Sequence, residues 1–191
     1  MEIRSFLAFE LPQEIKRTIF NVSEDVRRFS LDVRWVKASN IHLTIVFMGN
    51  VLSEHLEGIN DEVLKVCKRY GPFNISLKSI GVFSNRRNPR VMWVGLEGDI
   101  ERMSYFRDAL QKRLKSFGVK EEKRRFNPHL TLGRFRKSSK PSELLDDLLS
   151  RYHDLASSVC TLEELVLFKS DLNPKGAVYT KLNTWPLLGK H

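Results

Sequence analysis

A His-Leu-Thr sequence occurs twice in this chain, and the two copies hold the residues best suited to chemistry. His42 and Thr44 lie in "NIHLTIVFMGN", and His129 and Thr131 lie in "NPHLTLGR". Residues i and i+2 of a β-strand project from the same face. Each copy would therefore present an imidazole beside a hydroxyl, while the leucine between them faces a core. If the two strands lie close together, we expect two imidazoles and two hydroxyls to share one cleft.

This set of groups suits the hydrolysis of a phosphate diester. The hydroxyls can donate hydrogen bonds to the non-bridging oxygens. One neutral imidazole can take a proton from an attacking water, and one protonated imidazole can give a proton to the departing oxygen. The ordinary histidine pKa of ~6.5 permits both roles near neutral pH. The residues alone do not decide which histidine is the acid.

A single histidine on a strand is typical of a structural residue, so the repeat carries this argument. The two copies use two of only five histidines in the chain, and we interpret His55 and His153 as surface-helix residues. A zinc site would need a third ligand at recognisable spacing, which neither motif has. No phosphate-binding GxxxxGK[ST] loop and no GxSxG nucleophile sequence occurs either. We therefore expect no metal site.

The charge is concentrated around the second motif. The formal net charge is +9, and residues 112–137 hold ten Lys or Arg against two Glu. This balance favours a polyanionic partner, RNA first, although a solvated lysine-rich surface is the alternative interpretation. Lys123, Arg124 and Arg125 are candidate RNA contacts.

The bulk composition is that of an ordinary globular protein. Hydrophobic residues make up 41% of the 191 residues, and no apolar run approaches the ~20 residues of a membrane span. The start "MEIRSFLAFELP" is a poor signal peptide and a good first strand. The two cysteines, Cys67 and Cys160, form no CxxC pair. These features predict a cytoplasmic protein with no membrane partner and no obligate protein partner.

Strand and helix patterns alternate along the chain and predict an α+β protein. No Gly-, Ser- or Pro-rich linker divides it, so we expect one domain over residues 1–191, built from two similar halves with one motif each. We predict a turn at Gly49-Asn50 and a single strand over residues 161–170. Helical spacing of apolar residues occurs in four segments, at residues 15–29, 56–66, 100–117 and 141–148.

The paired motifs and their flanks, "RSFLAFELP", "VRWVKASNIHLTIVFMGNV" and "FNPHLTLGRFR", resemble the 2H phosphoesterase superfamily. They are most similar to its RNA 2′,3′-cyclic phosphodiesterase branch, also named 2′-5′ RNA ligase. The resemblance implies a bilobal duplicated fold, with two antiparallel sheets flanked by helices and the site in the central groove. It implies hydrolysis of an RNA-terminal 2′,3′-cyclic phosphate to a 2′-phosphate, with 2′-5′ ligation as the reverse reaction. It implies no metal and no cofactor.

The resemblance also assigns roles by position. His42 would be the acid at the leaving O3′, and His129 the base that holds the water. Thr44 and Thr131 would bind phosphate oxygens, and Arg134 would add positive charge there. In a regular strand Arg134 would face away from His129, so it needs a bend, which Gly133 could supply, or the end of the strand to reach the phosphate. An exposed arginine on a basic surface is the alternative interpretation.

Several questions stay open at this stage. Phe83 and Trp93 are possible base-stacking residues, and core packing is an equal interpretation. We expect the basic surroundings of His129 to lower its pKa, and His42 to stay protonated to a higher pH. The expected partner is RNA with a cyclic phosphate end, tRNA fragments being one candidate. The alternatives are a phosphodiesterase for a small nucleotide, such as a cyclic phosphate of ADP-ribose or a 2′-5′ oligoadenylate, and a non-catalytic RNA-binding module.

Overall fold

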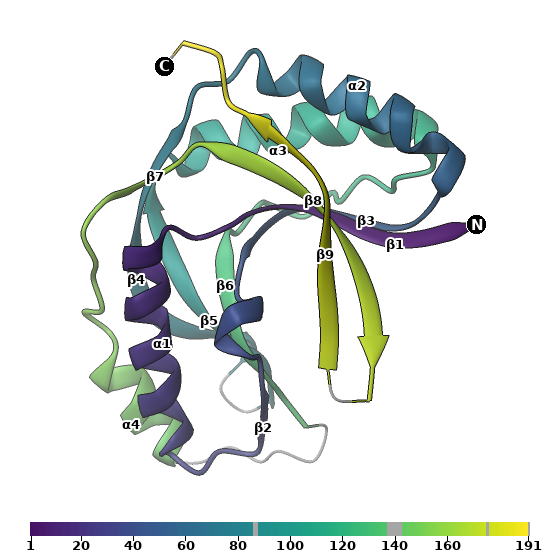
Figure 1. Ribbon diagram of the computed structural model, residues 1–191. Coiled ribbons are helices and arrows are strands. Elements are labelled where there is room, and N and C mark those ends of the chain that lie inside the picture. Colours follow the sequence, from purple (N-terminus) through teal and green to yellow (C-terminus); the bar gives the residue numbers. More distant parts are fainter. Residues whose placement is uncertain (86–87, 137–142, 175, 191) are drawn as a thin grey trace.

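The protein is an α+β molecule built around a strongly curled antiparallel sheet (Figure 1). The computed structural model describes residues 1–85, 88–136, 143–174 and 176–190. Its main elements are β1 (Glu2–Phe9), α1 (Gln13–Arg27), β2 (Val33–Trp35), β3 (Leu43–Leu52), α2 (Leu56–Cys67), β4 (Phe73–Asn85), β5 (Asn88–Gly98), α3 (Ile100–Leu114), β6 (His129–Phe135), α4 (Glu143–Arg151), β7 (Cys160–Leu162), β8 (Glu164–Asn173) and β9 (Gly176–Pro186).

Within the described residues, the strands run in the order β7-β4-β5-β6-β3-β1-β8-β9, with β2 added to β6. The two predicted antiparallel sheets are present as two halves of this one sheet. The halves meet where β6 pairs with β3, and the register there consists of one pair, Leu43 with Leu130. The motif strands therefore form the junction between the halves.

The helices leave the inner face of the sheet uncovered. Figure 1 shows α1 and α4 together beside β4, β5 and β6, and α2 and α3 together above β3. Their apolar stripes pack into one continuous core with the outer face of the sheet. The inner face carries a small separate apolar cluster, made of Phe6, Ala8, Val166 and Phe168.

The helix predictions are confirmed where the structure describes the chain. Ile15, Ile19, Val22 and Val26 form the buried stripe of α1. The third helix ends one turn early, because residues 115–117 form a 3-10 turn that Gly118 closes in the left-handed conformation, at φ 82°. The predicted start of the fourth helix at Pro141 lies outside the described residues.

Two strand predictions are wrong. Gly49 and Asn50 do not form a turn, because β3 continues through them to Leu52. Gly49 instead has a φ of 73° beside an irregularity in the β1–β3 pairing, a conformation that suits glycine. Residues 161–170 are not one strand, since β7 pairs with β4 whereas β8 pairs with β1 and β9. The chain crosses between the halves at Glu163.

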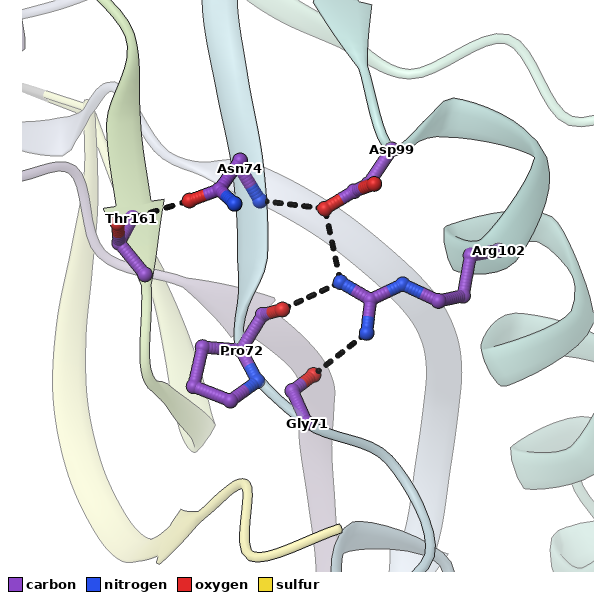
Figure 2. A network of polar contacts seen from close by, with 6 residues as sticks. All are labelled: Gly71, Pro72, Asn74, Asp99, Arg102 and Thr161. Atoms are coloured by element: carbon purple, nitrogen blue, oxygen red, sulfur yellow. Dashed lines mark hydrogen bonds and ion pairs between the residues drawn. The ribbon is translucent and has the colours of Figure 1, made fainter. Parts of the chain in front are cut away.

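A polar network fixes the edge formed by β4 and β7 to the start of α3 (Figure 2). The Asp99 carboxylate accepts hydrogen bonds from the backbone N–H of Asn74 at 2.7 Å and from Arg102 at 2.8 Å. Arg102 also donates to the carbonyl of Pro72, and the Thr161 hydroxyl donates to the Asn74 side chain at 2.9 Å. The network joins three segments that are distant in sequence, at an edge of the sheet separate from the motif strands.

Candidate active site

The two motifs meet through their central leucines, which are fully buried in the core. The strands are antiparallel, so continuing the register by one residue sets each histidine opposite the threonine of the other motif. The flanking side chains lie on the inner face and are all half-buried: His42, Thr44, His129 and Thr131. The structure thus brings the predicted quartet together on one face, related by an approximate two-fold arrangement.

Each imidazole is held by the backbone carbonyl two residues before it. Nδ1 of His42 lies 2.8 Å from the oxygen of Asn40, and Nδ1 of His129 lies 2.8 Å from the oxygen of Asn127. A carbonyl can only accept, so Nδ1 carries a proton in both rings. In the neutral ring the other nitrogen, Nε2, is then unprotonated. Nε2 is therefore the atom available for proton transfer in each histidine.

Sequence reasoning missed these two asparagines. The repeat is longer than His-Leu-Thr, because Asn40 and Asn127 stand at the same position before each histidine. A comparison of the two copies over five residues would have found them. Asn40 does more than its counterpart, since its side-chain amide donates to the carbonyl of Ala177 in β9 at 2.8 Å.

The His42 ring lies in an aromatic cluster. It stacks on Phe6 with ring centroids 4.7 Å apart, and Tyr179 meets it edge-on at 5.2 Å. Phe6 stacks in turn on Phe168 at 5.3 Å. Burial among these rings lowers the pKa of His42, and the hydrogen bond to Asn40 opposes that shift.

The His129 ring has fewer aromatic neighbours and a nearby cation. Phe83 meets it edge-on, with centroids 4.6 Å apart. Burial lowers the pKa of His129, the hydrogen bond to Asn127 opposes this, and the charge of Arg134 adds to the lowering. The expected direction is confirmed, but burial is the main cause. Burial lowers the pKa of His42 as well, so the basic surroundings do not by themselves separate the two rings.

Arg134 returns to the side of His129 through a β-bulge. Thr131 and Gly133 pair with consecutive residues of β5, which leaves Leu132 as an extra residue in β6. The extra residue reverses the side-chain alternation beyond it. Arg134 is exposed, and its charge acts on the pKa of His129. The bend predicted at Gly133 is therefore present, but the extra residue that causes it is Leu132, one position earlier.

Gly133 is needed for a different reason. A Cβ at this position would lie 2.4 Å from Cγ1 of Val33 and 3.0 Å from the ring of Trp35. Both residues belong to β2, which pairs with β6 here. The absence of a side chain at Gly133 therefore lets β2 pack closely against the bulge.

Phe83 and Trp93 both lie on the His129 side of the site, and both are half-buried. Their rings contact each other at 5.4 Å. The Trp93 indole also covers Gly81, where an added Cβ would approach it to 2.3 Å. Phe83 supports the His129 ring directly, which accounts for its position without a bound base. Base stacking on either residue stays a prediction.

The three basic residues before the second motif are exposed, but they are not equivalent. Arg124 forms an ion pair with Glu122 at 2.5 Å, and this contact lowers the pKa of the Glu122 carboxyl to about 2. Within the described residues, Lys123 and Arg125 form no ion pair. Of these three residues, Lys123 and Arg125 therefore carry the positive charges that no ion pair offsets.

His55 and His153 do not join the site. His153 is exposed and contacts the Asp154 carboxylate at 2.8 Å, as a surface residue does. The surface interpretation of His55 is wrong, because its ring is half-buried and packs against Phe117 at 5.7 Å. In the part of the chain that the structure describes, no group of three or more His, Cys, Asp or Glu side chains could hold a metal ion, and no helix has the length and hydropathy to cross a membrane.

A sizeable cavity lies elsewhere in the described part of the molecule. The cavity of ≈ 550 Å³ beside the start of α1 is lined by four glutamates, among other residues, and by neither motif. Carboxylates repel an anionic substrate, so this lining does not suit a phosphate diester. The four glutamates are Glu10, Glu14, Glu163 and Glu164. The donors and proton-transfer groups of the inner face fit that chemistry better.

Comparison with known proteins identifies the family of this chain. The family model described as the 2′-5′ RNA ligase superfamily matches residues 11–174. The chain belongs to this superfamily. A relative from Methanothermobacter thermautotrophicus, named RNA 2′,3′-cyclic phosphodiesterase, is 30% identical and covers 98% of this chain and 100% of its own length. A relative of the same name from Methanocaldococcus jannaschii is 31% identical, with coverage of 96% and 100%.

Solved structures match the fold over nearly the whole chain. A crystal structure of a Thermus thermophilus protein matches with a TM-score of 0.81 and 26% identity, covering 99% of this chain and 100% of its own. Escherichia coli LigT, crystallised with 3′-AMP, matches with a TM-score of 0.76 and 24% identity, with coverage of 98% and 99%. The second likeness concerns the fold alone.

Proposed function

We propose that this protein hydrolyses the 2′,3′-cyclic phosphate at an RNA end and leaves a 2′-phosphate. The observation that carries the proposal is the pair of antiparallel motifs, each of which offers a free Nε2 beside a hydroxyl on one face. The superfamily membership and the names of the two archaeal relatives support the same reaction.

In the proposed mechanism, the two histidines act on opposite sides of phosphorus. Nε2 of His129 takes a proton from the attacking water, whose oxygen forms the new bond to phosphorus. The bond from phosphorus to O3′ breaks, and Nε2 of His42 gives O3′ a proton. Thr44 and Thr131 donate hydrogen bonds to the non-bridging oxygens, and Arg134 stabilises the developing charge. No step uses a metal or cofactor.

The surroundings of the rings support this division of roles. A base must be neutral, and the nearby Arg134 disfavours the charged form of His129 in addition to burial. The shift at His42 has no comparable cation among its causes. The anionic cyclic phosphate would favour the protonated form of His42 once it is bound.

The wider assignment follows from the same site. We infer that residues 1–191 act as one domain, in which each half of the sheet supplies one motif. Ligation of a 2′-phosphodiester is the reverse reaction, and abundant water favours hydrolysis. The buried thiols of Cys67 and Cys160 agree with a cytoplasmic location, where RNA fragments, including those of tRNA, occur.

The decisive experiment supplies an RNA oligonucleotide with a 2′,3′-cyclic phosphate, in excess EDTA, and identifies the end formed. We expect a 2′-phosphate. A 3′-phosphate would mean that O2′, rather than O3′, is the leaving oxygen. Activity that returned only with added zinc would overturn the metal-free mechanism. Parallel assays with 2′-5′ oligoadenylate and a cyclic phosphate of ADP-ribose test the small-nucleotide alternative, and binding without turnover would indicate the RNA-binding module.

A further inference from the structure

The proposed reaction fixes the side from which RNA reaches the site. In an in-line displacement the attacking and leaving oxygens lie on opposite sides of phosphorus. The ribose carries the leaving O3′, so it lies on the side of the acid, His42. The preceding nucleotides are joined to that ribose. They must therefore cross the half of the sheet formed by β3, β1, β8 and β9, rather than the half that holds Phe83 and Trp93.

The inner face of β1 leads away from His42 along this path. Arg4, Phe6 and Ala8 project from the same face of the strand. Phe6 stacks on the His42 ring, and Ala8 pairs with a residue of the first motif. Phe47 of β3 is the register partner of Phe6 and so shares its face. Phe6 is 3% exposed whereas Phe47 is 51% exposed. The aromatic surface thus continues from beneath the histidine into solvent.

Arg4 stands at the outer end of this surface with its charge available. Its guanidinium carbon lies 4.8 Å from the centroid of the Phe47 ring. Within the described residues no carboxylate pairs with it, and the neighbouring Glu2 side chain instead accepts a hydrogen bond from Asn50 at 3.0 Å. The aromatic contact orients the guanidinium without neutralising it.

Two cations act on Tyr179, which contacts the His42 ring. Burial raises the pKa of the Tyr179 phenol, while the charges of Arg134 and Arg4 both lower it. One of these cations belongs to the proposed phosphate site and the other to the outer end of β1. Tyr179 is therefore close enough to both cations for their charges to act on its phenol.

We propose that Arg4, held by Phe47, binds the phosphate that links the terminal nucleotide to the one before it. This subsite rests on the proposed function, because the leaving-group side determines the path. Its ligand is single-stranded RNA of at least two nucleotides. Contacts to phosphate are independent of sequence, so the subsite selects for chain length rather than for base.

The test compares cytidine 2′,3′-cyclic phosphate with the dinucleotide CpC that ends in the same cyclic phosphate. In Arg4→Gln, kcat/KM for the dinucleotide should fall about 5- to 20-fold, the range for losing one exposed charged contact, while the mononucleotide value stays within about twofold. Arg17→Gln is the matched control, since Arg17 is exposed on α1. Equal losses on both substrates, or no loss on the dinucleotide, would overturn the subsite.

A binding measurement separates failure of the subsite from failure of the proposed function. Calorimetry with CpC ending in a 2′-phosphate needs no turnover. The slope of log affinity against log salt should become shallower by roughly 0.7 in Arg4→Gln, as expected for one lost single-strand phosphate contact. An unchanged slope would overturn the subsite even in an active enzyme. Phe47→Leu keeps the charge but removes its support, and an unchanged dinucleotide preference would overturn the role given to Phe47.

Discussion

The two halves of the site hold their histidines in the same way but surround them differently. Both Nδ1 atoms lie 2.8 Å from a backbone carbonyl, so both rings present Nε2. His42 stacks in an aromatic cluster that reaches β9, whereas His129 has the Phe83 ring and the charge of Arg134 beside it. The repeated motif gives the two rings the same orientation, whereas their neighbours differ.

This difference suggests how one repeated sequence can serve two roles. A symmetric pair of histidines would have equal pKa values and no fixed acid. In the proposed mechanism, the charge of Arg134 lowers the pKa of His129 in addition to burial, and the RNA chain approaches from the side of His42. The comparison between the halves can therefore be tested by removing one element of asymmetry at a time.

The largest effects should come from the histidines themselves. His42→Ala and His129→Ala should each lower kcat by about 10²- to 10⁴-fold, the range for removing a positioned acid or base. His153→Ala, at an exposed position, is the control. A substrate with a far more acidic 3′ leaving group should largely restore His42→Ala and leave His129→Ala defective. Restoration of His129→Ala instead would exchange the two roles.

Arg134→Gln should lower kcat/KM by about 10- to 100-fold through lost charge stabilisation, and should also change the pH profile. In the proposed mechanism the activity needs neutral His129, so the acid limb should follow the pKa of His129. Arg134 lowers that pKa, and its removal should raise it, moving the acid limb to higher pH. The alkaline limb follows His42 and should stay in place. A shift of the alkaline limb alone would contradict the assignment.

Tyr179 tests the aromatic side of the comparison. Tyr179→Leu removes the ring that meets His42 edge-on at 5.2 Å, and should cost about tenfold in kcat because the imidazole is less well positioned. Tyr179→Phe keeps the ring and should stay within about twofold. Equal losses in the two variants would show that the hydroxyl, rather than the ring, matters.

The smallest effect should come from the three basic residues that precede the second motif, Lys123, Arg124 and Arg125. Lys123→Gln with Arg125→Gln should reduce the salt dependence of KM for a long RNA, by at most roughly 1.4 in the log–log slope, and should leave a cyclic mononucleotide unaffected. Arg124→Gln alone should change less, because Glu122 already pairs with that charge. Equal salt sensitivity for long and short substrates would argue against any role for the segment.

Local periodicity explains what was predictable. The helical stripe of α1 and the alternation around Leu43 and Leu130 are properties of single segments, so they can be recognised without the fold. The asparagine two residues before each histidine is also visible in the sequence, but the sequence prediction did not include it. Gly49 was misinterpreted because a glycine with positive φ suits a turn and a bulge equally well.

The sequence by itself determined the α+β class, the two histidine-threonine strands and the single face that each presents, because side-chain alternation depends only on the strand's own period. Only the tertiary structure decided that the strands pair through Leu43 and Leu130, that an extra residue in β6 returns Arg134 to His129, and that β9 brings Tyr179 to His42. These features depend on register between distant segments, which is set by packing of the whole sheet rather than by any local pattern.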